Sequence, residues 1–442
     1  MKPIFTRYIC LWSGLLTLFL LFNGCERNHL SLVALGERPR LETLEVGVTE
    51  AWLKVKVATA NAGQELHLYR DGTLVLTQPL PSDTTVMADS LQPKQTYRFR
   101  AELWVGNEKL YTSPPLTITT LDTTSDNFQW EINTFGGGAG SSFLQDVAII
   151  NENDIWAVGE IHTAQTDTYD SLGNWQPPFN AVHWNGVKWE LKRIPAVTSF
   201  GSITKGKINA VFAFNSNNVW FFSDAGSFAH WNGKNWESEF VSQRFGGINK
   251  IWGSSPTDIF FVGTNGNITH YDGQGWQKIE SGTDMPIMDI WGSPVDNSGN
   301  FYVLAMASLF LQAPAPKLLQ IAGNQVIPRY LPVTNSLLSV WFHSPRKVFV
   351  CGGGLHYGVN NLWKRVHELP DIFLKRVRGN GLNDIWVVGD FGMAAHFNGL
   401  HWKTHAELSL GNGNYDGLAV KGKLTVAVGW QRSNAVIVKI NS

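Results

Sequence analysis

Short segments in which apolar and polar positions alternate recur along this chain, and two kinds of segment recur as a pair. The first is an acid or amide followed by two or three apolar residues, as in Asp258 to Val262. The second reads His, aromatic, Asn or Asp, Gly, two variable positions and Trp, and begins at His183, His230, His270 and His396. Alternation predicts half-buried strands, and Asn-Gly or Asp-Gly favours a tight hairpin because both central residues need positive φ. Each pair therefore predicts a strand followed by a β-hairpin.

The pair recurs about every forty residues, a period typical of stacked repeat architectures. In the second copy the pattern predicts four strands, at residues 208–214, 219–223, 227–231 and 236–240. The strand phrase occurs seven times, near Trp156, Trp220, Phe260, Tyr302, Phe349, Trp386 and Val426. We therefore expect seven four-stranded units.

The seventh unit reaches the end of the chain after its third strand, Val436 to Ile440. A strand-like segment before the first unit, Phe128 to Ile132, supplies the missing fourth strand. Completion of the last sheet by an N-terminal strand closes a ring and removes exposed sheet edges. The predicted fold of residues 127–442 is an all-β, seven-bladed β-propeller. Six or eight blades follow if residues 296–335, where Leu309 to Pro314 replaces the hairpin phrase, are divided differently.

Residues 38–122 contain a second group of alternating segments, two of which are joined by the hairpin turn Arg70-Asp71-Gly72. The segment from Leu91 to Tyr97 resembles the E–F corner of fibronectin type III domains, in which the Tyr hydroxyl bonds to the upstream backbone. The segment from Ser113 to Leu121 resembles the last strand of that family, and Trp52 lies near the position of its core Trp. The resemblance implies an Ig-like β-sandwich. We expect this domain to be a spacer that holds the next domain off the membrane.

The N-terminus begins with basic residues, continues with an apolar run from Ile9 to Phe22 and reaches a small residue before Cys25. This order is typical of an export signal, and the run is too short for a comfortable membrane span. A Cys directly after a small residue resembles the bacterial lipoprotein signal, which implies cleavage after residue 24 and acylation of Cys25. Residues 25–37 are then a tether, and Glu26 favours the outer membrane. The alternative is an ordinary cleaved signal.

Charge argues against nucleic acid as a partner, and cysteine content argues against an intramolecular disulfide. Without residues 1–24, which carry Lys2 and Arg7, 33 basic residues face 36 acidic ones, so no electrostatic footprint for nucleic acid is expected. Cys10 leaves with the signal and Cys25 is acylated, so Cys351 has no intramolecular partner for a disulfide. We expect a monomer attached to the membrane through its lipid, without cofactor or metal.

The repeats resemble β-propeller repeats of secreted bacterial proteins, distantly of the Kelch and Asp-box types. The Asp-box Ser is absent here, however, and three of four copies have Asn in place of Asp. Arg193-Ile194-Pro195 resembles a sialidase phrase but follows the first unit instead of opening the propeller. The four repeated His residues occupy one strand position in separate blades, so they cannot converge on one metal ion. We expect them to form hydrogen bonds to neighbouring strands or turns.

The largest departure from the repeat is an insertion from Glu160 to Asn180, between the second and third strands of the first unit. Second-to-third loops share a face with the loops that link successive blades, and loops on a rigid frame often carry function. Aromatic residues in the insertion could stack on a sugar or anchor a protein, whereas its two carboxylates are too few for a calcium shell. The alternative is an inert surface loop. Candidate ligand-binding residues on these loops are Asp167, Tyr169, Asp170, Trp175, Gln176 and Arg244.

One position on the first strands carries mixed charges near the predicted ring centre. It is occupied by Asp146, Ala210, Lys250, Asp289, Ser339, Arg376 and Gly417. A central ligand site would use Lys250, Asp289 and Arg376. Pairing between neighbouring blades is the alternative explanation.

Together these features predict a non-catalytic binding module displayed on the cell envelope, with a glycan or an envelope protein as ligand. One alternative is a glycan-active enzyme, a sialidase-like hydrolase or a lyase, which needs a pair of carboxylates or a Tyr–Glu pair on the loop face. Another is a scaffold for outer-membrane assembly.

Overall fold

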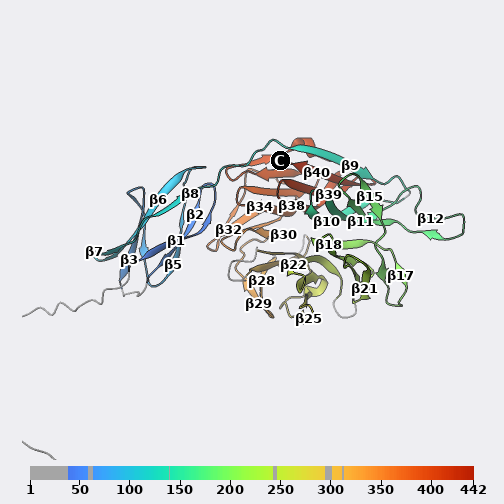
Figure 1. Ribbon diagram of the computed structural model, residues 1–442, viewed down its shortest axis with the longest axis horizontal. Coiled ribbons are helices and arrows are strands. Elements are labelled where there is room, and N and C mark those ends of the chain that lie inside the picture. The colour runs from blue at the N-terminus through green and yellow to red at the C-terminus, as the bar shows by residue number, and fades with distance from the viewer. Residues whose placement is uncertain (1–37, 58–62, 139, 242–245, 294–300, 311–312) are drawn as a thin grey trace, which may run out of the picture.

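The computed structural model describes residues 38–57, 63–138, 140–241, 246–293, 301–310 and 313–442. The predicted signal, the tether and Cys25 lie outside this range. Strands dominate the described residues, and the helical elements there are two single turns, η1 (Thr264–Gly266) and η2 (Ala406–Leu408). No helix in these ranges has the length and apolar character needed to cross a bilayer. An N-terminal pair of sheets lies beside a larger ring of sheets (Figure 1).

The N-terminal part consists of two sheets packed around one apolar core. The three-stranded sheet contains, in spatial order, β1 (Arg40–Val46), β2 (Ala51–Lys56) and β5 (Thr84–Ala88). The second contains β4 (Thr73–Pro79), β3 (Gln64–Arg70), β6 (Thr96–Val105) and β7 (Glu108–Thr112), with β8 (Leu116–Thr119) paired to β6. Leu53, Leu66 and Phe99 are fully buried between the sheets. One core therefore joins strands from both sheets.

Two turn predictions hold in this part, and one core prediction is wrong. Asp71 and Gly72 both have positive φ, at 50° and 86°, as the β3–β4 hairpin requires. The Tyr97 hydroxyl accepts a hydrogen bond of 2.8 Å from the Gln92 amide. Trp52 is buried but lies outside the sandwich core, because Leu53 next to it points inward and alternation directs Trp52 to the opposite face of β2.

Within the described residues, seven four-stranded sheets follow in chain order. The first three contain β10 (Phe143–Asn151), β11 (Asp154–Ile161), β14 (Phe179–Trp184) and β15 (Trp189–Lys192); β18 (Ile208–Asn215), β19 (Asn218–Ser223), β20 (Ser227–Trp231) and β21 (Trp236–Phe240); and β22 (Ile248–Ser255), β23 (Asp258–Gly263), β24 (Ile268–Tyr271) and β25 (Trp276–Ile279). Two small hairpins project from the connections, β12 (Thr168–Tyr169) with β13 (Trp175–Gln176) and β16 (Ala196–Val197) with β17 (Ile203–Thr204).

The remaining four sheets complete the series. They contain β26 (Ile287–Gly292), β27 (Val303–Ala307), β28 (Lys317–Ala322) and β29 (Gln325–Arg329); β30 (Leu337–Phe342), β31 (Lys347–Gly352), β32 (Gly354–Val359) and β33 (Leu362–Arg365); β34 (Leu374–Gly381), β35 (Asp384–Gly389), β36 (Ala394–Phe397) and β37 (Trp402–Thr404); and β38 (Gly413–Lys421), β39 (Leu424–Gln431), β40 (Asn434–Asn441) and β9 (Gln129–Phe135). Each first strand contacts the first strand of the next sheet, and β38 contacts β10, so these strands surround a common centre.

Both ends of the ring sequence meet in the last sheet. Strand β9 pairs antiparallel with β40, and Trp130 lies opposite Ile440. The predicted pairing of residues 128–132 with 436–440 is therefore present. The fourth sheet has its hairpin although the repeated phrase is absent from this copy, as the sequence shows. Strands β28 and β29 form that hairpin further along the chain, through a turn at Gly323 with φ 58°.

The repeated pair of segments has a structural explanation. In each copy the ring of the His on the third strand lies against an aromatic residue of the second strand; the Trp220 and His230 rings, for example, lie 4.0 Å apart. The His Nε2 atom bonds to the acid or amide that begins the second strand. These bonds join His183 to Asp154 at 2.8 Å, His230 to Asn218 at 3.1 Å, His270 to Asp258 at 2.6 Å and His396 to Asp384 at 3.1 Å. The predicted structural role of these residues is confirmed.

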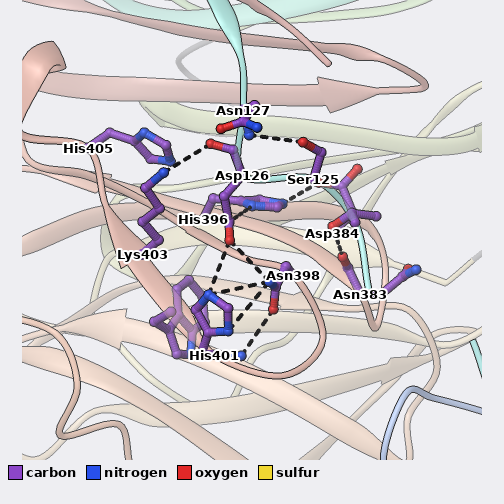
Figure 2. A network of polar contacts seen from close by, with 12 residues as sticks. Ser125, Asp126, Asn127, Asn383, Asp384, His396, Asn398, His401, Lys403 and His405 are labelled. Carbon is purple, nitrogen blue, oxygen red and sulfur yellow. Dashed lines mark hydrogen bonds and ion pairs between the residues drawn. The ribbon is translucent and has the colours of Figure 1, made fainter. Parts of the chain in front are cut away.

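The connection between the two parts is held to the sixth sheet of the ring (Figure 2). Asp126 lies between His396, whose Nδ1 is 3.0 Å from Oδ1, and Asn398, whose Nδ2 donates to Oδ2 at 3.1 Å. His401 Nε2 lies 3.1 Å from Oδ2 as well. His396 therefore has a carboxylate partner on both ring nitrogens.

Further polar contacts join the first sheet of the sandwich to turns of the ring. Lys347 Nζ lies 2.6 Å from Glu50 Oε1, and Arg346 Nη1 lies 3.5 Å from Glu45 Oε2. A Cβ added at Gly399 would meet the Val48 side chain at 2.2 Å, so backbone and side chain are in close contact there. These contacts fix the sandwich against the side of the ring opposite the cavity described below.

Candidate functional site

All seven first strands share an irregularity that builds a cavity at the centre of the ring. Each strand has a β-bulge at the equivalent position, where one residue has no partner in the pairing register of the second strand. A bulge re-aims side chains and is frequent beside functional sites. All seven bulge residues line one cavity of about 630 Å³, which we name the central mouth. They are Gln145, Asn209, Asn249, Met288, Leu338, Lys375 and Asp416.

The central mouth is predominantly basic. Besides Lys375, the cations in its lining are Lys207, Arg376 and Arg432, whereas Asp416 is the single carboxylate among the described lining residues. Lys375 is partly neutralised by Asp390, at 3.3 Å. Burial raises the pKa of Asp416, against the opposing effect of Lys375 and Arg376. The mouth therefore favours anionic ligands.

Several polar atoms in this lining have no hydrogen-bond partner. Within the described part of the chain these buried, unpartnered atoms are Gln145 Oε1, Asn209 Oδ1 and Arg376 Nε. Leaving a buried polar atom without a partner costs about 1–3 kcal/mol. A bound ligand that supplies the missing partners would recover part of this free energy. The mouth thus combines positive charge with polar groups available to a ligand.

Below the mouth, two buried ion pairs close the channel. Asp146 pairs with Lys250, and the Asp289 carboxylate lies 2.7 and 3.0 Å from the guanidinium of Arg378. In each pair the sheet between the partners contributes a small residue, Ala210 or Ser339, at the equivalent position. The ion pairs therefore reach across one sheet. The predicted pairing between neighbouring sheets is present as hydrogen bonds, such as the one that the Ser339 hydroxyl donates to Asp289 at 2.6 Å.

The carboxylates of these pairs also hold the intervening sheets. Asp146 accepts the Val211 amide at 3.1 Å, and Asp289 accepts the Val340 amide at 3.1 Å. Burial opposes ionisation of Asp289, but Arg378 and Arg376 hold its pKa at about 2. Burial lowers the pKa of Lys250, although Asp146 counteracts it. The pairs Asp146–Lys250 and Asp289–Arg378, which we name the plug, thus form a structural layer that is the floor of the mouth.

The central residues predicted from the sequence fall into two groups. Lys250 and Asp289 are occupied by the ion pairs of the plug, whereas Arg376 lines the mouth, where its Nη1 donates to Leu338 O at 3.1 Å. Arg378, the partner of Asp289, was absent from the predicted set. The sequence could have identified Arg378, because it lies two residues after Arg376. Side chains at this spacing lie on the same face of a strand, here β34.

The insertion of the first sheet forms a separate hairpin that projects away from the ring at β12 (Figure 1). Its predicted polar residues bond within the hairpin: Asp167 Oδ2 lies 2.7 Å from His162 Nδ1, and Asp170 Oδ2 accepts from Gln176 Nε2 at 3.0 Å. Tyr169 and Trp175 pack edge to face, 5.2 Å apart, and both are exposed. The structure brings these residues together, but none lines the central mouth. Arg244 lies outside the described residues.

Aromatic residues border the central mouth on its own face of the ring. Phe310 and Phe373 pack 5.1 Å apart, and Lys375 Nζ lies 5.5 and 5.3 Å from their ring centres. Phe391, on the β35–β36 turn, is 61% exposed and follows Asp390, the partner of Lys375. Phe200 is 93% exposed but lies further out, on the β16–β17 turn, whose first strand contacts β20 and β21. Exposed apolar side chains therefore border the basic pocket near Lys375.

The ring of four-stranded sheets around a central channel is a β-propeller. No protein-family model matches the chain, and no curated protein matches it. Among solved structures, one described as "YCF48 bound to D1 peptide" aligns with a TM-score of 0.52 and 14% identity, over 72% of this chain and 99% of that one. Another, "Crystal structure of WD40 beta propeller domain of Doa1", aligns with a TM-score of 0.48 and 10% identity, over 70% and 96%. At 14% identity, the first likeness concerns the fold alone.

Proposed function

We propose that this protein is a protein-interaction module that binds its partner on the face of the propeller containing the central mouth. The observation that carries the proposal is the convergence of seven bulge residues on one basic cavity with unpartnered polar atoms. Exposed aromatic residues beside such a pocket are typical of interaction hot spots. The similar structure described as bound to a peptide adds support.

The finer architecture belongs to this proposal. The seven described sheets correspond to seven blades closed by β9, with repeats of the Kelch or Asp-box kind. The strand order of residues 38–122 and the Tyr97 hydrogen bond support a fibronectin type III-like spacer. Because the sandwich contacts the opposite side of the ring, it leaves the mouth uncovered. A spacer in this position would present the mouth to a partner.

We also propose that Cys25 carries the lipid that attaches the protein to the bacterial outer membrane, where an envelope protein is the partner. The support is the order of basic, apolar and small residues before Cys25. A Cys25→Ser variant should move from the membrane fraction to the soluble fraction of cell lysates. An unchanged membrane fraction for Cys25→Ser would contradict acylation at this residue.

Crosslinking in intact cells tests the interaction itself. Photo-crosslinking residues at positions 310 and 391, beside Lys375 of the mouth, should capture a defined protein. The same photo-crosslinking residue in place of Lys234, at an exposed turn on the opposite face, is the matched control. Equal capture from both faces, or no protein captured from the mouth face, would contradict the proposed function. A bound glycan would instead support the glycan alternative, and an integral membrane partner the scaffold alternative.

The enzyme alternative gains no support from the central mouth. A glycoside hydrolase of the usual type needs two carboxyl groups flanking one bond, and sialidases use a Tyr–Glu pair. The described lining of the mouth contains Asp416 as its single carboxylate and neither Tyr nor Glu. Binding is therefore the function that this geometry supports best.

A further inference from the structure

Three of the four cations of the central mouth lack a carboxylate in ion-pair contact among the described residues. In the described part of the chain, none of Lys207, Arg376 and Arg432 forms an ion pair, although the whole chain is close to neutral. The buried pairs just below show that this fold neutralises its central cations where structure alone requires them. The uncompensated charge at the mouth therefore points to a ligand. Resting on the proposed function, we infer that the mouth binds a carboxylate side chain from an acidic segment of the partner protein.

Arg376 is the residue best placed to receive this carboxylate. Its Nη1 is fixed by the Leu338 carbonyl at 3.1 Å, which orients the guanidinium, while the buried Nε has no partner. A guanidinium held in place loses little further rotamer entropy on binding, and hydrogen bonds between charged groups are stronger than neutral ones. The incoming carboxylate supplies the acceptor that Nε lacks.

The amide residues on the opposite arc complete a polar cradle. Gln145 and Asn209 each have a buried side-chain oxygen without a partner. A half-turn of either amide exchanges its oxygen and nitrogen, so each can donate to a carboxylate or accept from a peptide N–H. Lys207 and Arg432 extend the positive charge to the rim of the mouth. Donors thus surround the space in several directions.

The rest of the lining favours a peptide over a highly charged polyanion. Met288 and Leu338 contribute apolar surface to the same cavity, and Asp416 repels a ligand with several closely spaced charges. The exposed Phe310 and Phe391 beside Lys375 offer apolar contacts to residues flanking the carboxylate. One acidic side chain in the mouth with apolar neighbours on the rim matches this arrangement.

Selection of peptides from a displayed library of random dodecapeptides tests the inference. Peptides that bind the purified protein should be enriched in Asp and Glu. Their amidated synthetic copies, whose only carboxylates are side chains, should lose about tenfold or more in affinity when the acidic residue is replaced by its amide. Arg376→Gln should weaken binding to a similar extent.

Two further variants keep the inference testable if Arg376→Gln does not fold. Arg432→Glu, at an exposed rim position, should weaken binding of the acidic peptides. The loss of affinity should grow with each negative charge added to the peptide. Lys234→Glu, on the opposite face, makes the same charge change and should leave the affinity unchanged. Raising the salt concentration should weaken binding, because the contact is between charges.

The outcomes separate the two proposals. Selected peptides without acidic enrichment that still compete at the mouth would overturn the inference and leave the interaction module intact. Equal affinity of the wild type, Arg376→Gln and Arg432→Glu for acidic peptides would also overturn it. If no peptide is selected while polygalacturonate, an acidic polysaccharide, binds in an Arg376-dependent way, both proposals fail.

Discussion

The buried pair between Asp289 and Arg378 offers the sharpest test of how the ring holds together. The two side chains are 0% and 3% exposed, and they belong to sheets separated by the sheet of Ser339. Asp289 also accepts from the Ser339 hydroxyl at 2.6 Å and from the Val340 amide. The Asp289 carboxylate therefore joins its own sheet to the next two. Replacing Arg378 by Met keeps most of the side-chain volume and leaves this carboxylate buried without its cation.

The expected cost follows from that burial. Removing one partner of a buried pair destabilises a protein by about 3–5 kcal/mol, because the remaining charge is uncompensated. The double variant Asp289→Leu/Arg378→Met removes both charges, and such replacements are often close to neutral. We therefore expect the double variant to be more stable than Arg378→Met by at least about 2 kcal/mol.

The pH dependence gives a second readout with a defined sign. In the wild type the pKa of Asp289 is lowered from 3.8 to about 2, so its contribution, roughly 2.5 kcal/mol, is present above pH 4 and lost as the pH falls towards 2. Without Arg378, the pKa of Asp289 should rise, because Arg376 and Lys250 are then the cations that still oppose the effect of burial. The variant should therefore lose less stability than the wild type as the pH is lowered from 4 towards 2.

Urea denaturation followed by tryptophan fluorescence measures these differences. Because the chain has two parts, the midpoint of the propeller transition is compared between variants instead of a single global free energy. Lys234→Met, at an exposed turn, is the control for removing a cation and should change the midpoint little. A cost below about 1 kcal/mol for Arg378→Met, or a double variant no more stable than the single one, would contradict this role of the buried pair.

Three other variants test separate parts of the fold. Replacing His270 by Ala should cost about 1–2 kcal/mol, measured by thermal unfolding, because it removes the bond to Asp258 and a ring contact; an unchanged melting temperature would rule out this role. Replacing residues 129–135 by a Gly/Ser segment of equal length should expose the edge of β40 and produce oligomers in size-exclusion chromatography, whereas a stable monomer would mean that closure is dispensable. Tyr97→Phe should lower sandwich stability by about 1 kcal/mol through loss of the Gln92 bond, and no shift in its unfolding transition would count against that contribution.

Much of the scaffold could be predicted because the repeat carries its own signals. The Asn-Gly hairpins, the stacked His and the apolar strand phrase are local features, so the second unit was predicted to within two residues of β18 to β21. The prediction that Trp52 belongs to the sandwich core was wrong because the face on which it lies depends on the register of β2. Burial of Leu53 in the core decides that register. The position of the fourth hairpin could not be predicted, because its turn, at Gly323, lacks the aromatic phrase.

The site was harder to predict, for a physical reason. Strict alternation puts Gln145 and Asp146 on opposite faces of β10, so only the Asp146 position was assigned to the ring centre. The bulge breaks the alternation and brings both residues to the channel, one to the mouth and one to the plug. No local sequence signal marks the bulge, because the bulge residues share no chemistry from blade to blade.

The bulge separates residues of the packed core from residues of the mouth within a single strand, and variants of β26 can measure this separation. Ile287, just before the bulge, is fully buried in the apolar packing, whereas Met288 is the bulge residue and faces the mouth. Ile287→Ala should destabilise the propeller by about 2–5 kcal/mol, because it leaves a cavity in a packed core. Met288→Ala removes a side chain that already borders an open cavity, so it should cost less than about 1 kcal/mol. Both are measured as shifts in the urea midpoint. Equal costs would mean that the bulge residues hold the sheets together, and then the mouth would be a by-product of packing instead of a surface free to specify a partner.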